Sequence, residues 1–181
     1  MDSLMQRPSH PSRSALHAAL GLALLVCLSS LARGQDTSPQ AKQDPAHLEL
    51  PATDEGVPGK GTLRRYDWFK NLWRTKRTQW HRDTKRDQGA VVFFGDSITQ
   101  GWGPDMGGSF PGFKVANRGI SGDTTRGMLL RIQGDVLDVN PSGVVMLMGT
   151  NDLEERDSAE DIAHNVRAIV DRLTAHNANL P

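Results

Sequence analysis

Three short polar segments of this sequence carry residue types that acyl transfer needs. Residues 95–99 hold Ser97, residues 117–126 are rich in glycine and threonine, and residues 149–152 hold Asn151. Attack by a hydroxyl on an acyl carbonyl moves negative charge onto the carbonyl oxygen, and preorganised neutral donors stabilise that charge. A serine hydroxyl, a backbone N–H beside a flexible glycine and a carboxamide would together supply a nucleophile and the parts of an oxyanion hole.

Each segment by itself also has an ordinary structural explanation. Asp96 and Ser97 are residue types that commonly cap the start of a helix. Gly119 and Gly122 could simply permit turns with positive φ, and Asp152 is a common turn residue. The segments acquire a joint function only where the fold brings them together.

Each polar segment follows a short apolar run that predicts a β-strand. The runs are residues 90–94, 113–116 and 143–148, and continuous apolar runs are typical of strands buried on both faces. Apolar residues at helical spacing predict helices over residues 124–137 and 158–175. This alternation predicts a parallel sheet with helices on both faces. Right-handed crossovers then place all three strand ends, and the polar segments after them, on one rim.

The amino terminus has the composition of an export signal. Two arginines precede residues 15–28, which are apolar apart from one histidine, and Ala32 and Gly34 are small residues at the positions that a signal peptidase reads. The apolar stretch is short for a membrane span. We therefore predict a signal peptide over residues 1–34 and an exported protein, periplasmic or secreted.

The chain after this signal divides into a linker and one domain. Residues 35–61 are rich in Gln, Asp, Pro, Thr and Gly without a sustained apolar period, so we expect a disordered linker. Residues 62–181 would form the folded domain. Its first element is an amphipathic helix whose apolar stripe is predicted to pack in the core. The stripe consists of Tyr66, Phe69, Leu72, Trp73 and Trp80.

Composition argues against several kinds of partner. The 21 basic and 21 acidic residues balance, whereas a nucleic-acid-binding domain would show a basic excess or stripe. Signal removal would take away Cys27, the sole cysteine, so neither a disulfide nor a thiol nucleophile is expected. No cluster of His, Cys and Asp has metal-ligand spacing. We therefore predict no nucleic acid, no metal, no cofactor and no transmembrane span after signal removal.

The three polar segments together resemble the SGNH, or GDSL-type, hydrolase family. Gly95-Asp96-Ser97, Asn117-Arg118-Gly119 and Gly149-Thr150-Asn151-Asp152 are similar to three of its signature blocks, in order. Residues 119–126 look most like the branch that contains platelet-activating-factor acetylhydrolase catalytic subunits. The resemblance covers about residues 63–180. It implies a flavodoxin-like three-layer α/β/α fold and metal-free deacylation of small esters, lipids or acetylated sugars.

The same resemblance implies roles for individual residues. Ser97 would be the nucleophile. The N–H groups of Ser97 and Gly119, with the Asn151 side chain, would form the oxyanion hole. Asp96 and Asp152 would support the site.

In the family that the sequence resembles, a fourth signature block, Asp-x-x-His, lies near the carboxyl end after two further strands. This block supplies the general base. Asp161 to His164 spells it, but at about 100° per residue His164 lies opposite the apolar face of its helix and is predicted to face solvent. The chain stops at Pro181, about where a fourth strand would begin. We therefore expect a fragment or truncated product with three strands, nearly inactive because its serine lacks a base.

Two other functional classes stay open. One is a secreted ligand-binding module that keeps the cleft without the chemistry. The other is a flavodoxin-like domain that holds a phosphate or nucleotide at the same rim. The glycine-rich segments are compatible with the second class, but no Gly-x-Gly-x-x-Gly or Walker pattern follows a predicted strand.

Overall fold

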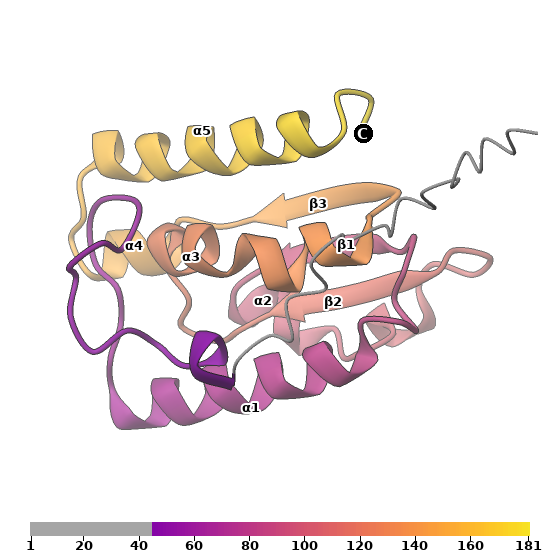
Figure 1. The fold of residues 1–181 in the computed structure, drawn as a ribbon, viewed down its shortest axis with the longest axis horizontal. Helices are drawn as coiled ribbons and strands as arrows, with labels where there is room; N and C mark the ends of the chain where they lie inside the picture. The colour runs from indigo at the N-terminus through magenta and orange to yellow at the C-terminus, as the bar shows by residue number, and fades with distance from the viewer. Residues whose placement is uncertain (1–44) are drawn as a thin grey trace, which may run out of the picture. The chain divides into compact units, whose positions relative to one another are not determined.

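The computed structural model describes residues 45–181, in which a parallel sheet lies among helices (Figure 1). The sheet order is β2-β1-β3, with strands β1 (Val91–Gly95), β2 (Val115–Gly119) and β3 (Gly143–Leu147). β1 pairs in parallel with both neighbours, and its last residue, Gly95, lies opposite Gly119 and Leu147. All three strands therefore end at one rim, which confirms the α/β prediction.

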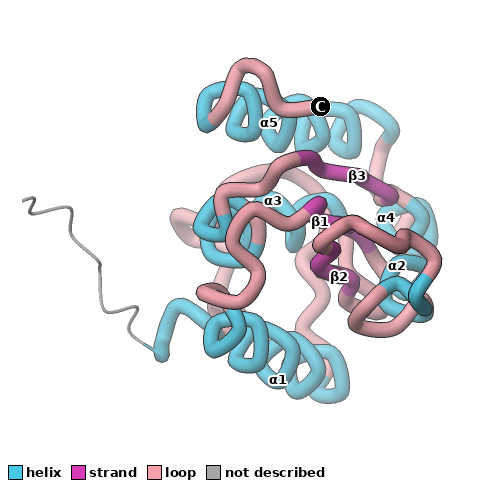
Figure 2. Tube along the Cα trace, turned by 90° about the vertical axis from the view of Figure 1, so that its right-hand side faces the viewer, coloured by secondary structure: helices cyan, strands magenta, loops and turns pink. Residues whose placement is uncertain are grey.

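The helices surround this sheet on two sides. They are α1 (Asp67–Asp83), α2 (Ser97–Gly101), α3 (Thr125–Asp135), α4 (Thr150–Glu154) and α5 (Ala159–His176), with short 3-10 turns η1 (Pro45–Leu48), η2 (Met106–Gly108) and η3 (Leu137–Val139). Figure 2 shows α2 and α3 on opposite sides of the strands. None of the helices within residues 45–181 combines the length and the apolar character that crossing a membrane requires.

The main core lies between the sheet and the pair α3 and α5. Val92 and Phe94 of β1 are fully buried on this side, as are Ile132 of α3 and Ile169 of α5. Alternate residues of a strand point to opposite faces, so Val92 and Phe94 share one face. The helices predicted over residues 124–137 and 158–175 thus cover the same face of the sheet.

A second cluster packs α1 against the domain. Phe69, Trp73 and Trp80 are buried, and Leu72 packs partly against them, which confirms the core role predicted for these four residues. Tyr66 is 52% exposed, so its assignment to the buried stripe is wrong. The reason is local, because the helix begins one residue later and Tyr66 is its N-cap.

The opposite face of the sheet is much less covered. Val145 and Leu147 of β3 are 49% and 39% exposed, and Ile98 and Trp102 of the α2 region are each about half exposed. The prediction that residues 143–148 are buried on both faces is therefore wrong for the end of β3. An apolar run shows that burial would be favourable, but it does not show which element covers each face.

The second strand lies further along the chain than the sequence predicted, at residues 115–119 in place of 113–116. Its extra residues include Asn117 and Arg118, whose polar side chains conceal the strand from a hydropathy pattern. Both are buried and hydrogen-bonded, and the Arg118 guanidinium donates to Asp87 at 2.8 Å. Polar residues are tolerated in a buried strand when each has a hydrogen-bond partner.

The segment before α1 also differs from the sequence expectation. Residues 58–64, here called the strap, lie in or next to the predicted linker, yet they bond to distant residues. Lys60 N–H donates to Asn165 Oδ1 at 2.9 Å, and the Asn165 amide donates back to Lys60 O at 2.8 Å. Such side-chain partners are invisible to local composition. Residues 35–44, and the signal peptide predicted over residues 1–34, lie outside the described residues.

Candidate active site

Ser97 lies at the rim, where the chain leaves β1 and enters α2. The Asp96 carboxylate caps this helix, because its Oδ1 accepts the Ile98 N–H at 2.9 Å. Ser97 is the first residue of α2 and is exposed. Among residues 45–181, the Ser97 hydroxyl has no hydrogen-bond partner. The hydroxyl is therefore open to a solute, and no described side chain activates it.

Gly119 ends β2 directly beside the first turn of α2. A Cβ atom at this position would lie 2.8 Å from Asp96 O and would also clash with Gln100 N. Only glycine therefore lets α2 approach the end of β2 this closely. The Gly119 N–H donates to Asn117 Oδ1 at 2.8 Å. This donor, predicted to serve the oxyanion hole, is thus already engaged by a neighbouring side chain.

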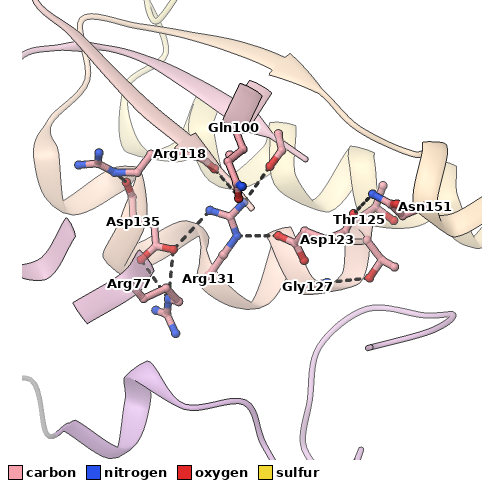
Figure 3. Close-up of polar contacts among 12 residues, drawn as sticks. Arg77, Gln100, Arg118, Asp123, Thr125, Gly127, Arg131, Asp135 and Asn151 are labelled. Carbon is pink, nitrogen blue, oxygen red and sulfur yellow. Dashed lines mark hydrogen bonds and ion pairs between the residues drawn. The ribbon is translucent and has the colours of Figure 1, made fainter. Parts of the chain in front are cut away.

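Asn151 is held at the rim by α4, which follows β3. Gly149 makes the turn between them with a φ of +106°, a conformation that other residues rarely adopt. The Asn151 side chain is buried, its Nδ2 donates to Asp123 O at 2.8 Å (Figure 3), and its Oδ1 accepts from Arg64 Nη1 at 3.3 Å. A carboxamide nitrogen has two hydrogens, so one donor remains after the Asp123 contact.

Asp152 connects the start of α4 to the start of α3. Its carboxylate accepts the Thr125 N–H at 3.0 Å and also the Thr125 hydroxyl. Burial raises the pKa of Asp152, and these bonds from Thr125 only partly offset that effect. The structure therefore places Asp96 and Asp152, the two predicted supporting residues, in contact with backbone groups at the rim.

A buried arginine joins the ends of two strands, and sequence reasoning missed it. The Arg131 side chain is fully buried on α3, and its Nη2 donates to Arg118 O at 2.9 Å and to Gly95 O at 3.2 Å (Figure 3). Its Nε donates to Asp123 Oδ2 at 2.7 Å. The guanidinium carbon lies 4.6 Å from the centroid of the Phe94 ring. Arg131 therefore holds the ends of β1 and β2 together from the face of the sheet that α3 covers.

The charge of Arg131 belongs to a larger buried cluster. Arg131 also lies 3.4 Å from Asp135, which Arg77 of α1 contacts at 3.1 Å. Alternating charges satisfy each other, as buried charges must. The one signal in the sequence was the placement of Arg131 among the apolar residues of the predicted helix over residues 124–137. A charged residue on a helix is ordinarily read as solvent-exposed.

Asp123 joins this cluster to Asn151, because its backbone carbonyl accepts from the Asn151 amide while its carboxylate pairs with Arg131. Complete burial raises the pKa of Asp123 to about 6, although the Arg131 charge acts in the opposite direction. Asp123 Oδ1 is buried without a hydrogen-bond partner in the described part of the chain. Asp123 lies in the second polar segment, but no pattern in the sequence indicates this role.

The histidines of the described chain are exposed, and none of them is hydrogen-bonded to Ser97. His164 is exposed on α5, as predicted, and His81 and His176 are exposed on α1 and α5. No histidine of residues 45–181 bonds to the Ser97 hydroxyl. In the same part of the chain, no group of three or more His, Cys, Asp and Glu residues is arranged to hold a metal ion.

An apolar hollow of about 170 Å³ adjoins the start of α2. It lies on the open face of the sheet, and Phe93, Ile98, Trp102 and Leu147 contribute to its lining. Ile98, one of the lining residues, directly follows Ser97 in the sequence. A cavity lined in this way can take a small apolar group.

Comparison with known proteins places this geometry in a family context. The model of the family described as "GDSL-like Lipase/Acylhydrolase family" matches residues 93–181. The human platelet-activating factor acetylhydrolase IB subunit alpha2 is 32% identical over 105 residues, which cover 54% of this chain and 43% of that protein. The rat protein of the same name matches equally well. The chain thus spans less than half the length of these relatives.

Two solved structures share the fold. An acylhydrolase from Bacteroides fragilis is 27% identical, with a TM-score of 0.50, and the match covers 62% of this chain and 55% of that chain. A protein from Streptococcus pneumonia described as a platelet activating factor is 20% identical, with a TM-score of 0.57, and the match covers 63% of this chain and 54% of that chain. Over residues 93–181, this chain is therefore similar to the GDSL-like lipases and acylhydrolases.

Proposed function

We propose that this chain carries the nucleophile and the oxyanion donors of a serine esterase. The observation that carries the proposal is the strand register, which sets Gly95 opposite both Gly119 and Leu147. Ser97 and Asn151 follow the ends of neighbouring strands, with Gly119 at the end of the third. The family match supports ester hydrolysis as the reaction class.

The reaction would proceed by acyl transfer through Ser97. The Ser97 oxygen attacks the acyl carbonyl, its proton passes to a base, and the alcohol of the ester leaves with a proton. Water then attacks the acyl-enzyme, which releases the acid and restores the hydroxyl. The second Asn151 N–H is available for the carbonyl oxygen, whereas the Gly119 N–H would first have to leave Asn117.

These 181 residues should by themselves have low esterase activity. The Ser97 hydroxyl has no base among its contacts in residues 45–181. In a studied serine hydrolase, loss of the histidine alone lowers turnover by a factor on the order of 10⁶. We therefore expect slow hydrolysis of p-nitrophenyl acetate and slow but selective acylation of Ser97.

The substrate class that we propose is a small ester, a lipid ester or an acetylated sugar. The apolar hollow, which Ile98 helps to line, would accept a short acyl or alkyl group. Acetyl is one candidate, because the curated relatives are named as acetylhydrolases. The predicted export signal supports a substrate met in the periplasm or outside the cell.

Covalent labelling tests the nucleophile without requiring fast turnover. A fluorophosphonate forms a P–O bond with a reactive serine and releases fluoride, and mass spectrometry then locates the labelled peptide. We expect the label on Ser97 and its loss in Ser97→Ala. Ser142→Ala is the matched control, because Ser142 is exposed and precedes β3 at the opposite end of the strands. Equal labelling of several serines, or none in the folded protein, would contradict the proposal.

The unpartnered hydroxyl also favours a second candidate, a ligand-binding module without catalysis. Such a module would bind an ester or a glycan at the rim and leave it intact. Ligand-detected NMR with an acetylated sugar separates the two functions. Binding that survives Ser97→Ala, together with an absence of Ser97 labelling, would favour the module.

A further inference from the structure

Arg64 of the strap is a buried cation beside Asn151. Its side chain is 6% exposed, and each of its bonds goes to α4 or to the turn that follows. Nη1 donates to Asn151 Oδ1 at 3.3 Å, while Nη2 and Nε donate to Glu154 and Glu155, each at 2.6 Å. The guanidinium therefore spans the helix that presents the carboxamide.

These contacts fix which way the Asn151 carboxamide points. A guanidinium can only donate, so it must face the amide oxygen, and the Asp123 carbonyl can only accept, so it must face the amide nitrogen. A single orientation satisfies both partners. The opposite orientation would set the amide NH₂ against the Arg64 N–H and the amide oxygen against Asp123 O.

Arg64 stays charged and stays in place. Burial lowers the pKa of Arg64, but the bonds that it donates to Glu154 and Glu155 outweigh burial and raise the pKa above its ordinary value. The strap that carries Arg64 is also anchored, because Thr62 N–H and its hydroxyl donate to Asp157, each at 2.8 Å. A Cβ on Gly122 would lie 3.1 Å from Arg64 Nη1, so the second polar segment packs closely against the guanidinium.

We propose that Arg64 is a positioning residue for acyl transfer, which orients the Asn151 carboxamide so that its second N–H can stabilise the oxyanion. This inference rests on the proposed function. It also gives a role to a segment outside residues 93–181, the range that the family model matches. The charge of Arg64 on the amide oxygen would also polarise the carboxamide and make its N–H a better donor.

The test compares Arg64→Met with Arg65→Met in the full chain. Arg65 is the next residue, but it bonds to Pro51 O, Thr53 O and Asp54 and has no contact with Asn151. Fluorophosphonate labelling of Ser97 is followed at increasing probe concentration. Because loss of one oxyanion donor costs roughly 10²–10³ in rate, we expect Arg64→Met to lower the maximum labelling rate at least tenfold. The half-saturating probe concentration should change less than twofold.

Arg65→Met should label within twofold of the parent protein, and Arg64→Lys should recover part of the rate, because lysine also only donates. Equal rates in Arg64→Met and Arg65→Met would overturn the proposal. So would a loss confined to the half-saturating concentration, or a loss in Arg64→Lys as large as in Arg64→Met.

A second measurement is independent of the proposed function. The Asn151 side-chain NH₂ is observed by ¹⁵N-resolved NMR and identified by its absence in Asn151→Asp. We expect exchange-protected hydrogens with shifted resonances in the parent and in Arg65→Met. In Arg64→Met we expect faster exchange with water and resonances that move toward those of a solvent-exposed carboxamide. Unchanged Asn151 signals in Arg64→Met would overturn the positioning role even where Ser97 reacts. Absence of Ser97 labelling in the parent, with the NMR change present, would overturn the proposed function alone.

Discussion

The two faces of the sheet are built on different principles. Under α3 and α5, apolar residues such as Phe94 and Ile169 are fully buried, and the fully buried guanidinium of Arg131 is paired. On the α2 side, Val145 and Ile98 are each about half exposed to solvent. The covered face therefore supplies rigidity, and the open face supplies access.

The candidate site lies where these two faces meet. Its proposed donors, Gly119 and Asn151, are buried and held by hydrogen bonds, whereas Ser97 is exposed at the start of α2. Preorganised donors need a rigid setting, because their value depends on not having to reorient when charge develops. The nucleophile needs the opposite, because a substrate must reach it. Substitutions on each face therefore separate the contribution of rigidity from that of access.

Removal of the buried cation should cost the most. Arg131→Met would leave Asp123 charged and unpaired and would free the carbonyls of Gly95 and Arg118. Loss of one partner of a buried ion pair typically costs about 3–5 kcal/mol. Urea unfolding followed by circular dichroism measures the change. Lys70→Met is the control, because the exposed Lys70–Asp67 pair should contribute less than about 1 kcal/mol. Equal losses of unfolding free energy in the two variants would show that Arg131 contributes no more to stability than a surface ion pair.

The same isoleucine-to-alanine change on each face compares their packing directly. Ile169 is fully buried on α5, and Ile98 is 52% exposed on α2. Ile169→Ala should lower the free energy of unfolding by about 2–5 kcal/mol, because it removes buried methyl groups and leaves a cavity. Ile98→Ala should lower it by less than about 1 kcal/mol. A loss for Ile98→Ala that matches Ile169→Ala would mean that the open face is covered in solution.

Much of this division could be predicted from the sequence, and the rest could not for physical reasons. The apolar runs gave β1 and β3 because continuous hydrophobicity signals burial, and His164 could be placed on the surface from helical spacing alone. The burial of Arg64 and Arg131 could not be foreseen, because it depends on partners from other elements. Glu155 lies 91 residues from Arg64, and Gly95, whose carbonyl Arg131 contacts, lies 36 residues from Arg131. The exposed end of β3 was missed for the same reason, since cover is supplied by other elements.

The close approach at the rim is tested by Gly119→Ala. The added methyl would lie 2.8 Å from Asp96 O, so the first turn of α2 would have to move away from β2. Overpacking of this kind typically costs about 1–3 kcal/mol, and we also expect slower labelling of Ser97. Gly101→Ala is the matched control within α2, because a methyl there meets no atom within 4 Å. That change should stabilise the helix by about 0.5–1 kcal/mol. Faster labelling in Gly119→Ala would argue against a fixed α2.

The last predicted effect is a pH dependence that originates at Asp123. Burial raises its pKa in the folded protein to about 6, above the ordinary value of 3.8. Between these values the folded state holds a proton that the unfolded state has released, so the contribution of Asp123 to stability falls as pH rises from about 4 to about 6. The slope is at most about 1.4 kcal/mol per pH unit.

Urea unfolding of the parent and of Asp123→Asn across this range isolates that contribution, because asparagine does not titrate. The difference in unfolding free energy between the two proteins should favour the parent most at pH 4 and least above pH 6. The contribution of Asp87 to stability should depend on pH in the opposite direction. Burial raises its pKa, but the bonds from Arg86 and Arg118 outweigh burial and lower it. Its contribution is present at neutral pH and is lost in acid. The contrary outcome is a difference in unfolding free energy between the parent and Asp123→Asn that does not vary with pH. That result would mean that Asp123 stays ionised beside Arg131 throughout this range and does not titrate in the folded protein.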